Sequence, residues 1–339
     1  MLAFNLRHAL LLTCLVFATT SHAASFDCAG ASSPVEKSVC ADPYTSSLDE
    51  KLGALWRTTL AQVADPQALK ADQRSWLKQR NQCAANSSCL RRDYLMRLKA
   101  LEYVAKPFSW DATWQMIPWG VSSAAEVTTK RLDATHIAFD VSASNGGNSG
   151  DMDGVATIDG AVAHFTEGNC TLKFSALNGL LDVDSDGGER ACGGGMGVYY
   201  DGRYVASDQP VAIEYDLLSL GVVRTQQEDQ ALRTLLKNDY QTLLQNSGSM
   251  AAGETSGDVP EGEVNEFWLR GLASSNAAIL MSAPGGRVWL ALLVFDEQRK
   301  VRARYYTNVP KWKKRVPDVL LAWRERLSGD ATLPLDLMP

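Results

Sequence analysis

The densest group of charged side chains lies near the C-terminal end of the chain. Eight Lys and Arg residues fall within the seventeen residues 299–315, without an acid among them, and Tyr305, Tyr306 and Trp312 stand between them. Cations interleaved with aromatic rings favour contact with acidic polymers of the cell envelope. The alternative is an edge strand whose charges stay in solvent and prevent pairing with another chain. The residues expected to reach a partner are Lys311, Trp312, Lys313, Lys314 and Arg315.

An acidic run in the middle of the chain has the spacing of calcium ligands. From Asp182 to Gly187 it places Asp at every second position before a glycine, as in the first half of an EF-hand loop. The twelfth position of such a loop is Gly193 here, where calcium needs a bidentate glutamate. We therefore expect a flexible, solvated turn and no metal site; a looser calcium site is the alternative. The residues expected to reach a partner are Asp182, Asp184 and Asp186.

The cysteines favour disulfides over a metal site. Six of the seven lie beyond residue 24, an even number, as expected in an oxidising compartment. Zinc is the rival interpretation, but no pair is spaced Cys-x-x-Cys, and only His136 and His164 remain beyond residue 24. Sequence neighbourhood pairs Cys28 with Cys40, Cys83 with Cys89, and Cys170 with Cys192.

Motifs for catalysis are missing from the sequence. It contains no Gly-x-Ser-x-Gly elbow and no His-Glu-x-x-His pair. His164 lies on a predicted strand, where we expect it to be half-buried. The Gly-rich stretch Asn145–Asp151 lacks the lysine and the following helix of a phosphate loop, so it predicts a long hairpin loop. We expect a binding protein without enzymatic activity and without a cofactor.

Residues 1–23 have the features of a secretion signal. Arg7 precedes an apolar segment at 9–18, and Ser21-His22-Ala23 suits a signal peptidase. The apolar segment is too short to span a bilayer, and the residues around Cys14 do not form a lipoprotein cleavage box. We expect cleavage after Ala23 and a periplasmic or secreted protein without a membrane span.

The stretch from Cys28 to Leu101 predicts a small helical bundle. Capping boxes, a proline at the first helical position and apolar residues at helical spacing indicate four helices. Their expected starts are Ser33-Pro34-Val35-Glu36, Ser47-Leu48-Asp49-Glu50, Asp65-Pro66 and a point near Ser87. A core this small is marginal, so each disulfide is expected to add about 2–4 kcal/mol to its stability.

This bundle is similar to a known family. The matching residues are Cys28-Ala29, Pro34–Cys40, Leu48-Asp49, Gln73–Leu77, Arg80–Cys83, Cys89-Leu90, Tyr94 and Arg97-Leu98. Over roughly residues 26–102 they resemble the lysozyme-inhibitor LprI-like N-terminal domain family. The resemblance implies a helical fold in an oxidising compartment. It also implies inhibition of lysozyme, for which we expect the protein to occlude the enzyme's cleft.

The distribution of charge bears on the partner. Residues 24–104 carry 11 Lys and Arg against 9 Asp and Glu, residues 105–209 carry 6 against 14, and residues 210–339 carry 15 against 16. Such a chain is a poor match for nucleic acid, and its acidic middle attracts basic proteins such as lysozymes. Two other functions stay open. One is an envelope-binding or scaffold module for peptidoglycan or polymers, and the other is an immunity-type protein against a secreted muramidase toxin.

The whole pattern predicts an α+β multidomain fold. The helical domain at 24–106 would precede an acidic antiparallel β domain at 107–209 and an α+β domain at 210–339. In the β domain we expect strands near 136–142, 154–165, 170–174, 179–184 and 197–205, the last a hairpin around Asp201-Gly202. In the last domain we expect a helix from Thr225 through Leu244, a mobile loop at 245–262, strands at 266–272, 277–282, 287–295 and 301–307, and a helix at 318–327.

Overall fold

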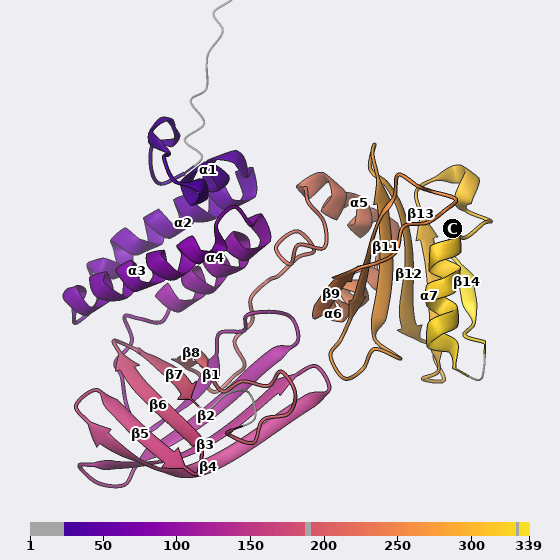
Figure 1. Cartoon of the computed structure of the whole chain (residues 1–339). Helices are drawn as coiled ribbons and strands as arrows, with labels where there is room; N and C mark the ends of the chain where they lie inside the picture. The colour runs from indigo at the N-terminus through magenta and orange to yellow at the C-terminus, as the bar shows by residue number, and fades with distance from the viewer. Residues whose placement is uncertain (1–23, 187–190, 330–331) are drawn as a thin grey trace, which may run out of the picture.

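The structure, a computed structural model, describes residues 24–186, 191–329 and 332–339. They form an α+β protein in which a helical module, a closed barrel and a six-stranded sheet follow one another along the chain (Figure 1). The secretion signal expected at 1–23 and Gly187 of the acidic run lie outside the described residues. No helix in the described ranges is long and apolar enough to cross a membrane.

Capping side chains define the helices of the N-terminal module. Ser33 and Glu36 form the expected capping box at the start of the first helix. The second helix begins at Pro43 and not near Ser47, because Asp42 accepts a hydrogen bond from the backbone N–H of Thr45 and caps it there. The elements are η1 (Cys28–Gly30), α1 (Pro34–Ala41), α2 (Pro43–Leu60), α3 (Pro66–Arg80), η2 (Asn81–Cys83) and α4 (Ser87–Leu101).

Two disulfides, Cys28–Cys40 and Cys83–Cys89, and a series of buried hydrogen bonds hold the module together. Arg80 Nη1 donates to the Tyr94 hydroxyl at 2.8 Å, and that hydroxyl donates to Asp49 Oδ1 at 2.7 Å. These three residues of the family-like pattern therefore support the module's own core. The structure contains the three disulfides expected from the sequence, which are Cys28–Cys40, Cys83–Cys89 and Cys170–Cys192.

Eight consecutive antiparallel strands close into a barrel. They are β1 (Ala112–Met116), β2 (Ser123–Arg131), β3 (His136–Asn145), β4 (Asn148–Asp159), β5 (Val162–Glu167), β6 (Cys170–Leu177), β7 (Leu180–Asp186) and β8 (Gly202–Ala206). The barrel closes where β8 pairs with β1. Residues alternate between buried and exposed along β2, so one side of the strand fills the interior. Trp114, Phe139 and Phe174 pack there, and the interior is a core.

Several expectations for the barrel were wrong. β1 and β2 were not predicted, and a turn at Gly160 divides the expected strand at 154–165 into β4 and β5. The long loop expected at Asn145–Asp151 is a turn of two residues, in which Gly146 has a φ of 65° that favours glycine. No hairpin forms around Asp201-Gly202, because β8 begins at Gly202 and pairs with β7 and β1.

The C-terminal sheet has helices on both faces (Figure 1). Its strands follow the order β14-β13-β12-β11-β10-β9, and α5 and α6 pack on one face and α7 on the other. The elements are α5 (Gln226–Leu236), α6 (Asp239–Asn246), β9 (Ser249–Ala252), β10 (Glu263–Trp268), β11 (Ala277–Ala283), β12 (Arg287–Phe295), β13 (Val301–Thr307), η3 (Pro310–Trp312), α7 (Asp318–Ser328) and β14 (Leu335–Leu337).

The strands at 287–295 and 301–307 have the predicted bounds, and three other expectations for this part were wrong. The single helix expected from Thr225 to Leu244 is interrupted by Lys237, whose φ of 52° cannot continue a helix. The loop expected at 245–262 starts with the last two residues of α6 and contains β9. β13 is not an edge strand, because β14 pairs with it in parallel.

Candidate functional site

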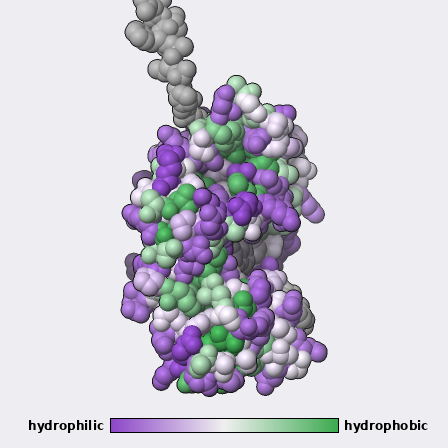
Figure 2. Space-filling model, turned by 90° about the vertical axis from the view of Figure 1, so that its left-hand side faces the viewer, coloured by the Kyte–Doolittle hydropathy of each residue, from purple (hydrophilic) through white to green (hydrophobic). Residues whose placement is uncertain are grey.

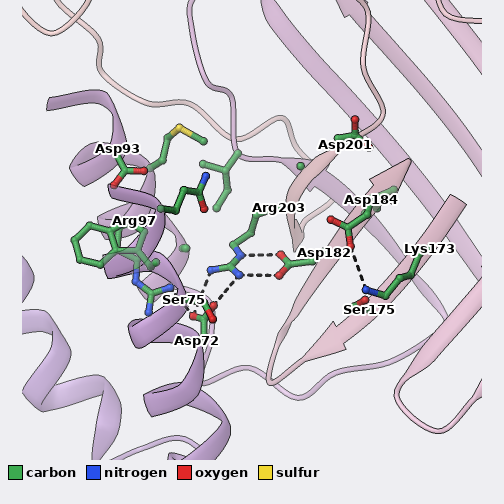
Figure 3. Close-up of a pocket in the computed structure, with 17 residues that line it drawn as sticks. Asp72, Ser75, Asp93, Arg97, Lys173, Ser175, Asp182, Asp184, Asp201 and Arg203 are labelled. Carbon is green, nitrogen blue, oxygen red and sulfur yellow. Dashed lines mark hydrogen bonds and ion pairs between the residues drawn. The ribbon is translucent and has the colours of Figure 1, made fainter. Parts of the chain in front are cut away.

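A cavity of about 520 Å³ lies between the helical module and the barrel, and we call it the cleft (Figure 3). α3 and α4 form one wall, and β6, β7 and the start of β8 form the other. The charged residues that line it are Asp72, Asp93, Arg97, Lys173, Asp182, Asp184, Asp201 and Arg203. The molecular face that carries the module and the barrel shows hydrophobic side chains in small groups among hydrophilic ones (Figure 2).

Helical and strand periodicity place the charged side chains in the cleft. Asp72 lies three residues after Leu69 and four before Trp76, so it belongs to the buried stripe of α3. Arg97 occupies the corresponding position three residues after Tyr94 on α4. On the barrel wall, Asp182 of β7 and Arg203 of β8 are directly opposite each other in the strand register.

A network of ion pairs forms the floor of the cleft (Figure 3). Arg203 donates to both oxygens of Asp182 at 2.7 Å and to Asp72 Oδ1 at 2.8 Å. Arg97, whose side chain is fully buried, donates to Asp72 Oδ2 at 2.5 Å. Burial works against ionisation of Asp72, but the two guanidinium groups outweigh it and hold its pKa below the ordinary value. The network ties the module to the barrel through Asp72.

Asp93 is a carboxyl group of the cleft without an ion pair. Its Oδ2 atom is buried and has no hydrogen-bond partner among the described residues. Burial raises the pKa of Asp93 to about 6, against the opposing effects of Arg80, of the nearby Trp76 indole N–H and of Arg97. The Trp76 indole N–H lowers the pKa of Asp93, and its Nε1 atom has no hydrogen-bond partner of standard geometry among the described residues.

Asp201 is a second carboxyl group with an unmatched oxygen. Its Oδ1 atom is buried without a hydrogen-bond partner within the described ranges. Figure 3 shows Asp93 beside the helices and Asp201 beside the barrel strands, with Arg203 between them. The two carboxyl groups therefore belong to different walls of the cleft.

The charges that line the cleft are unequal in number. Five carboxyl groups face three cations. Each cation already has an acidic partner, because Arg97 and Arg203 belong to the floor network and Lys173 lies 3.4 Å from Asp184. The unmatched atoms on Asp93 and Asp201 are hydrogen-bond acceptors when ionised, and a guanidinium or ammonium group supplies only donors. The cleft is suited to bind a cationic group.

The structure changes the interpretation of the acidic run. Asp182, Asp184 and Asp186 lie on β7 and not in a turn, because Leu181 and Val183 alternate with them and point into the core. Asp182 belongs to the floor network, whereas Asp184 and Asp186 are exposed. Asp151 and Asp153 lie on β4, and His164, expected to be half-buried, is exposed on β5.

The basic stretch does not form one binding face. Trp312 is buried against Trp289, with ring centroids 6.1 Å apart, so it offers no open ring to a ligand. Arg315 lies over the Trp312 ring at 4.6 Å and pairs with Asp258 at 3.2 Å. Arg302 and Arg304 are likewise paired with acids. Lys311, Lys313 and Lys314 near η3 are exposed, as is the paired Arg315.

Six charged residues of the cleft were missed from the sequence, and they are Asp72, Asp93, Arg97, Lys173, Asp201 and Arg203. They come from several elements, and no single local motif contains them all. Asp72 and Arg97 carried a usable signal, because a charged residue within the apolar stripe of a helix is rarely buried unless it is paired. Asp93 and Asp201 carried none.

Two negative findings bear on the identity of the site. Among the described residues, no group of three or more His, Cys, Asp or Glu side chains is placed to hold a metal ion. The chemistry of the cleft is therefore judged from its own lining residues. No protein family model, no curated protein and no solved structure matches this chain.

Proposed function

We propose that this chain is a periplasmic or secreted binding protein that captures a basic enzyme, a lysozyme in the first instance, and inhibits it by covering its cleft. The observation that carries the proposal is the pair of unmatched, buried carboxylate oxygens on Asp93 and Asp201 in a cleft whose cations are all engaged. A basic side chain of the partner would supply the missing donors. The proposal includes no reaction and no cofactor.

The outer face of the barrel adds long-range attraction. Asp140 on β3 and Asp153 on β4 are directly opposite each other and exposed, and neither has an ion pair among the described residues. Like charges in that position destabilise a strand pair, and a basic partner would relieve the repulsion. An acidic surface also accelerates encounter with a basic protein.

Two other features are consistent with this function. Three disulfides suit an oxidising compartment outside the cytoplasm. The resemblance of residues 26–102 to the LprI-like family points to lysozyme as the first target to test. Capture of envelope polymers has less support, because the basic stretch is divided among ion pairs and a buried Trp312. An immunity-type protein would use the same cleft against a muramidase toxin.

The decisive experiment compares targets and variants of residues 24–339. The protein is mixed separately with lysozymes, with muramidase-type toxins and with insoluble peptidoglycan, and both its removal from solution and residual muramidase activity are measured. We expect binding to a lysozyme and loss of the lysozyme's activity. Asp93→Asn with Asp201→Asn should weaken binding about tenfold or more, since hydrogen bonds to charged groups contribute about 1.5–3 kcal/mol each.

The control has the same change in charge outside the cleft. Asp159→Asn with Asp208→Asn removes two exposed carboxyl groups that do not line the cleft. We expect its affinity to stay within about twofold of the unmodified protein. Equal loss in both double variants would show that net charge alone governs binding. Capture by peptidoglycan without capture of any lysozyme would refute the proposed function.

A further inference from the structure

Asp93 and Trp76 form an unusual pair of polar groups in the cleft. Trp76 is only 7 % exposed, and its Nε1 atom and Asp93 Oδ2 are both buried without a hydrogen-bond partner in the described part of the chain. Both residues line the cleft. Buried polar atoms are nearly always hydrogen-bonded in folded proteins, so the unmatched Asp93 acceptor indicates a position that a donor group of a ligand completes.

The neighbours of Asp93 leave its charge uncompensated. On α3, Arg80 donates to the Tyr94 hydroxyl and to Asn81, and on α4, Arg97 donates to Asp72 and Gln73. The charged groups on the barrel wall are Lys173, Asp182, Asp184, Asp201 and Arg203, and their ion pairs do not include Asp93. Arg80 and Arg97 therefore lower the energy of the ionised carboxyl group only from a distance.

We propose that Asp93 is the cation-binding residue of the cleft, which holds a guanidinium or alkylammonium group in its ionised form and releases it in acid. The partner that brings this cation rests on the proposed function, whereas the chemistry of the site stands on the cleft alone. The same group occurs on arginine and lysine side chains of a protein and on free small amines. A small probe and a protein partner therefore test separate parts of the inference.

The direction of the pH effect follows from the state of the carboxyl group. Above its pKa of about 6 Asp93 is ionised and attracts the cation. Below that pH the neutral acid offers weaker attraction, and a proton must leave before the cation can bind. Affinity should be constant above about pH 7 and should fall by up to tenfold for each pH unit below 6.

Trp76 supplies a direct reporter for this group. In ¹⁵N-labelled protein the indole N–H signal of Trp76, assigned with Trp76→Phe, should shift with pH around a midpoint near 6 because Asp93 titrates beside it. At pH 7.5 methylguanidine and n-butylamine should shift the same signal in a saturable way. At pH 5 the probes should bind about tenfold or more weakly.

Two variants make the test specific. In Asp93→Asn the Trp76 signal should lose both its titration and its response to the probes. In Asp159→Asn, which removes an exposed charge outside the cleft, both should persist. A probe response that survives in Asp93→Asn would overturn the inference, and so would a titrating Trp76 signal that no cation shifts at pH 7.5.

A lysozyme then separates the inference from the proposed function. If the probes bind through Asp93 and no lysozyme binds, the site stands and the proposed function fails. If a lysozyme binds equally at pH 5 and 7.5 and equally to Asp93→Asn, the proposed function stands and Asp93 has no part in it. Lysozyme binding that weakens in acid for the unmodified protein, but not for Asp93→Asn, supports both the proposed function and the inference about Asp93.

Discussion

The cleft and the basic stretch at 299–315 carry opposite net charges. They also differ in which of their charged groups lack an ion-pair partner and in whether those groups are buried. In the basic stretch, acids from other elements pair with Arg302, Arg304 and Arg315, and exposed lysines remain in solvent. In the cleft the cations are paired, and carboxylate oxygens on Asp93 and Asp201 are buried without partners among the described residues. An exposed lysine keeps its water, whereas a buried oxygen has lost it. Of these two regions, the cleft is therefore the one whose described residues include buried groups that gain from binding a ligand.

The largest loss of stability is expected from breaking the ion pairs at the floor of the cleft. Asp72→Asn removes the only acid that the structure shows in contact with the fully buried Arg97 side chain. Leaving a buried charge without its partner costs about 3–5 kcal/mol. Chemical denaturation at pH 7 should show that loss, and Asp182→Asn should cost less because Arg203 keeps Asp72. A loss below about 1 kcal/mol for Asp72→Asn would contradict the role of the network.

A similar loss is expected in the basic stretch, but from packing. Trp312→Ala should destabilise the protein by about 3–5 kcal/mol, because the ring is buried against Trp289. The neighbouring Lys311→Ala should change stability by less than about 0.5 kcal/mol, because Lys311 is exposed. Denaturation of both variants measures the difference. A harmless Trp312→Ala that lost affinity for acidic polymers would restore this region as a binding face.

Substitution of Asp93 is expected to stabilise the protein, in contrast to the two variants above. Because folding raises its pKa to about 6, the protonated group stabilises the folded state below the unfolded pKa near 4, and this contribution is lost as pH rises through 6. At pH 7.5 Asp93→Asn should therefore increase the free energy of unfolding, by up to about 3 kcal/mol. The same variant should flatten the stability profile between pH 4 and 7. Denaturation at several pH values tests this, and an unchanged profile would show that Asp93 ionises as it does in water.

The smallest effect concerns the exposed aspartates of β7. Asp184 and Asp186 are exposed on β7, whereas Asp182 is committed to Arg203. Neutralising the two exposed residues should leave stability unchanged. It should slow association with a basic partner by about twofold to threefold at low salt and hardly at all above about 0.5 M salt. Stopped-flow kinetics measures both conditions. A change confined to dissociation would place these residues in direct contact with the partner.

Local features of the chain were predictable wherever one short segment contained the whole cause. The capping box at Ser33, the start of α3 at Asp65-Pro66 and the bounds of β12 and β13 follow from neighbouring residues. The three disulfides join cysteines that are close in sequence. Errors arose where a distant partner decides the outcome. Asp182–Asp186 looks like a turn until β6 and β8 are known to pair on either side of it.

The sequence by itself determined the α+β composition, the disulfide-linked helices of the N-terminal module and the net charge of each part of the chain. Only the tertiary structure decided which charges meet. Asp72 and Arg203 are 131 residues apart in sequence, and their contact depends on how the module packs against a closed barrel. Asp93 was likewise identified as a cation-binding residue only from the packing of the module against the barrel. Hydrophobic periodicity records which face of an element is buried, but the partner that each buried polar group finds, or lacks, depends on the elements packed against that face.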